Sequence, residues 1–188
     1  MATELLGRPT DTSVTVNVVA DTDLEAWFEW GTSSGAYTGQ TLPQTFTAGT
    51  PIEQVLTGLS PDTLYHYRMR YRTPGTLAWL TRPEHSFHTQ RARGASFVFD
   101  VQSDSHIYDK KGNHPLYTIA LQNEAADAPD FLVDIGDTFG DDHDLTIGYP
   151  TMLQLHFDQR PFLGLVGADA PVLDRKSTRL NSSHLVIS

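Results

Sequence analysis

The sequence predicts an N-terminal all-β sandwich over residues 1–90, followed by the incomplete start of an α/β domain over residues 97–173. Three observations lead to this prediction. Short segments with alternating apolar residues, separated by turn-forming residues, fill the first half of the chain. After a short basic linker, residues 91–96, nearly continuous apolar runs replace the alternation. These runs flank a segment with helical spacing, which is the order of a strand, crossover helix and parallel strand.

Alternation with a period of two marks the strands of the sandwich. In TSVTVNVV, Val14, Val16 and Val18 fall on one face, and EAWFEWG alternates in the same way. About seven short strands in about ninety residues are typical of two packed sheets. The remaining strands are predicted at 42–47, 52–57, 64–72, 77–81 and 85–89.

The stretch LTGLSPDTLYHYRMRYR carries a sharper signal. The spacing of Leu59, Pro61 and Tyr65 resembles the corner before a late strand of fibronectin type III-like domains. The resemblance implies that the Tyr65 hydroxyl hydrogen-bonds back to the corner backbone. We interpret the tryptophans as core aromatics, with an exposed platform for carbohydrate as the alternative.

The second half is predicted to contain buried parallel strands. SFVFDVQS and DFLVDIGD are apolar enough for strands covered on both faces. A helix interrupted at Pro161 and a third strand that starts at Pro171 are expected to follow them. The segment between the two strands, 115–127, begins with a proline, which suits a first helical turn. Its apolar spacing predicts a buried helix face made of Leu116, Ile119, Ala120 and Asn123.

Composition limits the possible functions. The chain has no cysteine, so a metal would have to be held by Asp, Glu, His or Asn. Its formal net charge of -10 disfavours binding to a nucleic-acid backbone. No apolar run is long enough for a transmembrane segment, and the opening MATELLGRPT lacks the apolar core of a signal peptide.

The last residues, 174–188, differ in character from the rest of the chain. Residues 174–184 resemble, position by position, the in-frame translation of a widely used short-read sequencing adapter, and the final four fit the bases that follow it. We therefore expect the natural chain to end near Leu173 and the adapter-like residues to be disordered. His184 is left out of the search for ligands for the same reason.

Candidate metal ligands follow the two buried strands. Asp104 and His106 come just past the first strand and Asp137 just past the second, so parallel pairing would bring them to one sheet edge. On an extended strand end, residues two apart project from the same side. Between residues 96 and 144, eleven acids stand against two lysines, which would raise carboxyl pKa values unless a cation sits among them. A plain capping role is preferred for Asp109, Asp127 and Asp130.

The segments FVFDVQSDSHI and PDFLVDIGDTFGDD resemble the D-x-H and G-D motifs of the calcineurin-like metallophosphoesterases. A sandwich ahead of these motifs is similar to the layout of purple-acid-phosphatase-type members. The resemblance implies a secreted or periplasmic enzyme that hydrolyses a small phosphoester at a two-metal site, with a metal-bound hydroxide as the nucleophile. The two divalent ions would be manganese, zinc or iron.

The resemblance also assigns roles to particular residues. Asp104 and His106 would bind the first metal, and Asp137 would bridge both metals. A purple Fe(III) site is not expected, because Gly140 stands where many relatives have Asp or Tyr. Further contacts to the substrate or around the ligands are expected from Asp141, His143 and His114.

The triplet Gly112-Asn113-His114 matches the first three residues of the family's third motif, but it precedes the G-D motif instead of following it. We therefore interpret it as a turn and a helix cap. The genuine third motif should follow the strand that starts at Pro171, where the adapter-like sequence begins. Lacking those ligands of the second metal, the 188-residue chain is expected to be inactive or weakly active.

Two alternatives stay open at this stage. In the first, the protein is a non-catalytic module whose sandwich binds glycan or protein and whose α/β part is degenerate. Such a module would bind no divalent metal. In the second, the enzyme is a phosphodiesterase or nucleotidase, which the motifs do not distinguish from a monoesterase.

Overall fold

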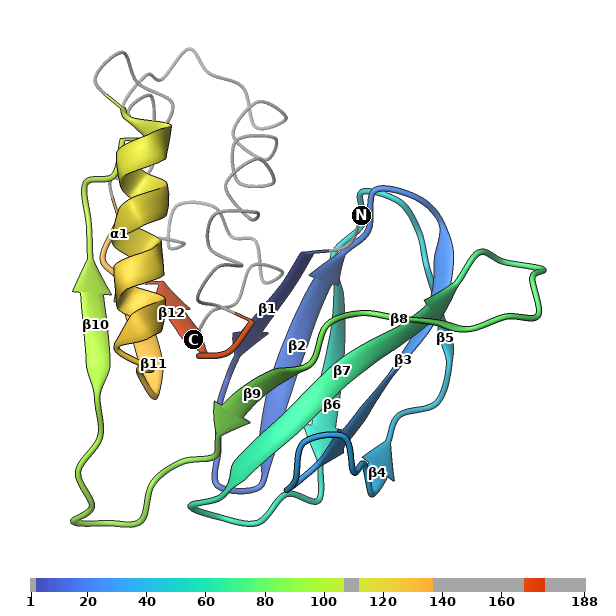
Figure 1. The fold of residues 1–188 in the computed structure, drawn as a ribbon, viewed down its shortest axis with the longest axis horizontal. Coiled ribbons are helices and arrows are strands. Elements are labelled where there is room, and N and C mark those ends of the chain that lie inside the picture. The colour runs from blue at the N-terminus through green and yellow to red at the C-terminus, as the bar shows by residue number, and fades with distance from the viewer. Residues whose placement is uncertain (1–2, 107–111, 137–167, 175–188) are drawn as a thin grey trace.

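The computed structural model describes residues 3–106, 112–136 and 168–174. These residues form a β-sandwich and, beside it, a small parallel sheet with one helix (Figure 1). Strands β1 to β9 build the sandwich, and β10, α1, β11 and β12 build the second unit. The predicted order of a sandwich followed by the start of an α/β unit is confirmed.

Both sheets of the sandwich are antiparallel. The smaller sheet has the order β1-β2-β6, with β1 at Thr3–Gly7, β2 at Ser13–Val19 and β6 at Ile52–Thr57. The larger sheet has the order β4-β3-β7-β8, with β5 beside β3 and β9 beside β7. Its strands are β3 (Leu24–Gly31), β4 (Gly39–Gln40), β5 (Gln44–Phe46), β7 (Leu64–Arg72), β8 (Leu80–Thr81) and β9 (His85–His88).

The apolar positions of the alternating strands form the core between the two sheets. Val14, Val16 and Val18 of β2 are buried there, opposite Phe28 of β3 and Tyr67 of β7. Because successive side chains of a strand point to opposite faces, one residue in two enters this core. The apolar positions of the alternation seen in the sequence are therefore the positions that enter this core.

Strand β1 is absent from the sequence-based prediction. Its residues Glu4, Leu5 and Leu6 are all buried, so TELLG shows no alternation. Glu4 is buried because the guanidinium of Arg82 lies 2.6 Å from its carboxylate. A charged residue inside a strand is read as solvent-facing unless its partner is known, and this partner lies far along the chain.

The predicted tyrosine corner is confirmed. The backbone N–H of Ser60 donates a hydrogen bond of 2.9 Å to the Tyr65 hydroxyl oxygen, and the Tyr65 ring stacks on Phe87 in the core. The hydroxyl satisfies a corner N–H that the sheet cannot satisfy. This contact fixes the chain where it enters β7.

The interpretation of the tryptophans is correct for Trp30 and wrong for Trp27 and Trp79. Trp30 belongs to the core, whereas Trp27 and Trp79 meet edge to face, half-buried on the outer face of the larger sheet. The guanidinium of Arg72 lies 4.5 Å from the Trp79 ring centre, and that of Arg70 lies 5.7 Å from Trp27. These arginines cover one face of each ring, which leaves less ring surface for the sugar platform considered as the alternative.

The second unit has the predicted parallel pairing. Its sheet order is β10-β11-β12, with β10 at Phe99–Gln102, β11 at Phe131–Asp134 and β12 at Val172–Asp174. Both pairs are parallel, so the three strands end at the same edge. The expectation that β10 is covered on both faces is wrong for the described residues. The Phe99 and Val101 side chains are about half exposed, whereas Gln102, which points to the opposite face, contacts Tyr117 of α1.

Helix α1 (His114–Ala126) begins as predicted, but its buried face differs. The Asn113 side chain accepts a hydrogen bond of 3.1 Å from Leu116 N–H, which confirms the turn and cap. Tyr117 and Leu121 are buried, whereas Leu116 is 61% exposed. Two stripes of this helix have suitable spacing, and the sheet selects the one whose tyrosine hydroxyl bonds the Gln102 amide. No helix among the described residues has the length and apolar character needed to cross a membrane.

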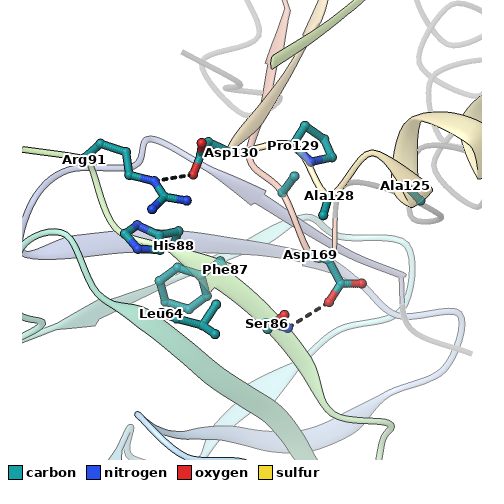
Figure 2. A pocket seen from close by; sticks show the side chains of 11 residues that line it. Leu64, Ser86, Phe87, His88, Arg91, Ala125, Ala128, Pro129, Asp130 and Asp169 are labelled. Atoms are coloured by element: carbon teal, nitrogen blue, oxygen red, sulfur yellow. Dashed lines mark hydrogen bonds and ion pairs between the residues drawn. The ribbon is translucent and has the colours of Figure 1, made fainter. Parts of the chain in front are cut away.

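The two units meet at the starts of β11 and β12. The buried Tyr67 hydroxyl donates to the carbonyl of Ala168 at 2.5 Å, and Ser86 N–H donates to Asp169 at 2.8 Å. Asp130 accepts from Arg91 Nε at 2.8 Å and from Val98 N–H at 3.0 Å, so this acid has a structural role, but it joins two segments instead of capping a turn or a helix start. A pocket of 450 Å³, whose lining includes the Ser86–Asp169 and Arg91–Asp130 pairs, lies between the two units (Figure 2).

Candidate metal-binding site at the strand ends

The D-x-H loop directly follows β10 and has an unusual backbone. Asp104 has a φ of 55° and His106 a φ of 43°, so both lie in the left-handed region. This corrects the expectation of an extended strand end. Residues other than glycine adopt this conformation at a cost of roughly 1 kcal/mol each, and such strain concentrates at functional sites. Two left-handed residues at alternate positions therefore mark this loop as a candidate site.

The loop brings two metal-binding groups together. Asp104 Oδ1 lies 3.6 Å from His106 Nε2. Two ligands that share one ion at about 2.1 Å lie about 3.0–3.6 Å apart for bond angles of about 90–120°. The observed spacing is at the upper end of this range. A carboxylate with an imidazole is also a donor pair that manganese, zinc and iron accept. The other Asp104 oxygen, Oδ2, accepts a hydrogen bond from the Ser103 hydroxyl, which holds the carboxylate in place.

Backbone hydrogen bonds tie this loop to the end of β11. Asp104 N–H donates to the carbonyl of Gly136 at 2.9 Å, and Ile135 N–H donates to the carbonyl of Gln102 at 3.0 Å. Gly136 directly precedes Asp137, so the D-x-H loop lies against the backbone that leads into the G-D aspartate. The side chains of Asp137, Asp141 and His143 lie outside the described residues, and their part in the site stays a prediction.

His114, the remaining candidate, opens helix α1. It is exposed, and its carbonyl accepts a hydrogen bond from the Thr118 hydroxyl. The helix-start interpretation of its triplet is confirmed by the Asn113 cap described above. Contact of His114 with a substrate stays a prediction.

Carboxylates crowd the sheet face beneath α1. Burial, together with the negative charge of Asp100 and Asp134, raises the pKa of Glu124 to about 7. Burial and the charge of Asp127 also raise the pKa of Asp100. The sequence predicts crowding of this kind, but it does not single out Glu124 or Asp134. In the sequence, Glu124 is one of several polar residues in the helix, and Asp134 interrupts an apolar strand without any further signal.

The described residues supply part of a metal site. Among them, no group of three or more His, Asp or Glu side chains is arranged to hold an ion. The donors that are described, Asp104 and His106, have the chemistry and spacing for one ion. They fit a divalent cation as two ligands of a set.

Comparisons with known proteins support the fold. No family model and no curated protein matches the sequence. The chain is similar to the solved structure of PhoD, with a TM-score of 0.63 and 16% sequence identity, over 92% of this chain and 38% of that one. Two further matches have lower scores. A sensor domain of the anti-sigma factor RsgI4 of Pseudobacteroides cellulosolvens matches at a TM-score of 0.38 and 10% identity, over 48% of this chain and 75% of that one. A redesigned β-sandwich protein matches at a TM-score of 0.34 and 16% identity, over 50% of this chain and 91% of that one. The chain therefore shares its fold with part of PhoD, and it spans 38% of the length of that chain.

Proposed function

We propose that the protein to which this chain belongs is a metal-dependent phosphoesterase. The observation that carries the proposal is the pair of Asp104 and His106, 3.6 Å apart on a strained loop and tied to the backbone of Gly136. PhoD, whose fold the chain shares in part, is a metallophosphoesterase. The carboxyl ends of parallel strands are also where α/β sheets place their functional groups.

In this proposal the chain's own residues hold and orient the first metal. Asp104 and His106 are its ligands, and the Ser103 hydroxyl keeps one carboxylate oxygen of Asp104 occupied so that the other faces His106. Asp137 is proposed to reach both metals. Two bound divalent ions would activate water and stabilise the negative oxygens of the phosphoryl group. Manganese, zinc and ferrous iron suit these ligands.

Charge supports the need for cations at this edge. A phosphoester is an anion, and the chain carries a formal charge of -10. The exposed carboxylate of Asp104 would repel such a substrate unless it were neutralised. A small phosphoester is thus the proposed substrate, in a secreted or periplasmic protein.

Metal binding by the 188-residue chain tests the ligands. We expect isothermal titration with Mn²⁺ to show binding that Asp104→Asn and His106→Gln each weaken by at least about tenfold, because even residues behind the ligands contribute that much. Asp127→Asn is the matched control, since it removes an exposed charge at the end of α1. Mn²⁺ affinity that is equal in all four proteins would refute the site.

Hydrolysis by the full-length protein tests the reaction. With an aryl phosphate as substrate, we expect Mn²⁺-dependent turnover that Asp137→Ala abolishes. Turnover that survives Asp137→Ala would overturn the proposal that Asp137 holds the metals at the strand ends. A full-length protein that binds no divalent metal would instead favour a binding module.

A further inference from the structure

Asp134 is a buried carboxylate behind the candidate ligands. It ends β11 and is 4% exposed. Burying a carboxylate is costly unless hydrogen bonds compensate. Asp134 Oδ1 accepts from the backbone N–H of Gly136 at 2.9 Å, and Oδ2 accepts from Gln102 Nε2 at 3.2 Å. Each oxygen of this carboxylate therefore holds a residue at the end of one of the two strands.

We propose that Asp134 is a positioning residue for the metal ligands on both strand ends. Its bond to Gly136 closes a turn of the kind in which an Asp side chain accepts from the backbone two residues later. Gly136 has a φ of 103°, which glycine adopts without the strain that other residues would suffer. The turn sets the direction in which the chain leaves β11 towards Asp137.

The same turn reaches the other strand end. Gly136 makes both contacts. Its N–H donates to Asp134, and its carbonyl accepts the N–H of Asp104 in the D-x-H loop. The chain of contacts from Asp134 through Gly136 to Asp104 consists of two hydrogen bonds, each 2.9 Å long. Asp104 has a strained backbone, which persists only where its surroundings fix it. The carboxylate of Asp134 provides part of that fixation.

A purely structural role for Asp134 makes a different prediction. Gln102 Nε2 donates both to Asp134 and to the hydroxyl of buried Tyr117, at 3.2 Å each. If Asp134 served only to seat α1 on the sheet, loss of the Tyr117 hydroxyl would act like loss of the Asp134 carboxylate. If Asp134 positions the ligands, loss of its carboxylate should disturb Asp104, and loss of the Tyr117 hydroxyl should not. Tyr117→Phe is therefore the matched control.

The inference rests on the proposed function, and metal affinity is its first test. In Mn²⁺ titrations of the 188-residue chain, we expect Asp134→Ala to weaken binding about 10- to 100-fold, as is typical of residues that orient metal ligands. We expect Asp134→Asn to stay within about threefold of the unchanged chain, because its amide oxygen still accepts from Gly136. Tyr117→Phe should leave the affinity unchanged even where it lowers the melting temperature. Equal affinity of Asp134→Ala and the unchanged chain would overturn the inference.

Amide hydrogen exchange of the metal-free chain gives a second, independent test. We expect the Gly136 and Asp104 N–H groups to exchange at least about tenfold faster in Asp134→Ala than in Tyr117→Phe, because the first change opens the turn. If the unchanged chain binds no Mn²⁺, the proposed function fails, and exchange alone then decides whether Asp134 holds the two loops. Unchanged protection of both amides in Asp134→Ala would refute that role.

Discussion

Removing the Asp169 carboxylate should loosen the junction between the sandwich and the parallel sheet, and more so in acid than in base. Asp169 precedes β12 and accepts Ser86 N–H on one oxygen, at 2.8 Å. Its other oxygen lies 3.1 Å from His85 Nδ1. The first contact does not depend on pH, whereas the second is strongest when His85 carries its proton.

The protonation of His85 is set by groups from several elements. Burial alone would lower the pKa of His85, but the hydrogen bond and charge of Asp169, with the nearby Glu4 of β1, outweigh burial and the repulsion from Arg82. The Tyr67 ring of β7 lies beside the imidazole. The pKa of His85 is therefore above its ordinary value of 6.5. A raised pKa means that the stabilisation is complete below pH 6.5 and is lost as the pH rises through the folded-state value.

The expected magnitude follows from the two contacts. The Ser86 bond is worth about 1 kcal/mol at any pH. A charged hydrogen bond is worth about 1.5–3 kcal/mol, but solvent screening reduces the His85 contact to about 1 kcal/mol because the Asp169 side chain is 51% exposed. Asp169→Ala should thus cost about 2 kcal/mol in acid and about 1 kcal/mol in base, or about 4–8 °C and 2–4 °C in melting temperature.

Thermal unfolding at about pH 5.5 and about pH 9, on either side of the histidine range, measures this difference. Asp169→Asn is the matched control, because its amide oxygen can still accept Ser86 N–H while the negative charge is lost. It should cost about 1 kcal/mol in acid and almost nothing in base. A cost of Asp169→Asn that is the same at both pH values would refute the role assigned to His85.

Two further predictions concern the unit that carries the candidate site. Leu121→Ala should cost about 2–4 kcal/mol of unfolding free energy, because Leu121 is fully buried on the inner face of α1, whereas Leu116→Ala should change that free energy by less than about 0.5 kcal/mol. Equal costs in urea unfolding would contradict the observed helix face. Glu124→Gln should stabilise the protein by about 1 kcal/mol at about pH 8 and not at about pH 5, after allowance for its partial exposure. The reason is that the pKa of Glu124 is raised to about 7, so the wild-type side chain must ionise beside Asp100 and Asp134 as the pH rises through that value. A change in melting temperature on Glu124→Gln that is the same at both pH values would contradict the proposed cost of ionising Glu124.

The sandwich could be predicted well because apolar residues at alternate positions enter its core. In β3 the alternation of the sequence is largely the alternation of burial, whereas in β2 Val14, Val16 and Val18 enter the core although the polar residues between them are buried as well. The same method misses β1, where Glu4 is buried by an ion pair with Arg82. It also misplaces the buried face of α1, because helical spacing alone cannot rank the Leu116 stripe against the Tyr117 stripe.

The candidate site was predictable in its topology and not in its local geometry. Two motifs after two parallel strands were enough to place Asp104 and His106 beside the backbone of Gly136. The left-handed backbone of both residues could not be foreseen, since Asp and His adopt it only where neighbouring contacts fix it. Asp134 was missed for a related reason. Its partners are a backbone N–H and the side chain of Gln102, which faces it only once the strands are in register.

Contacts from the sandwich side hold two parallel strands at their starts, opposite to the edge that carries the candidate site. Asp130 and Asp169 precede β11 and β12, and each is held from the sandwich side, by Arg91 and by Ser86. The opposite end of β11 carries the turn of Gly136, whose carbonyl accepts the N–H of Asp104 in the loop that follows β10. Fixing a strand at its start also fixes its register, and in a parallel sheet a slip of one residue would turn each side chain to the other face. The Asp130 contact at the junction and the hydrogen bonds of Asp134 therefore act on opposite ends of β11, and both hold the strand that places Gly136 beside Asp104.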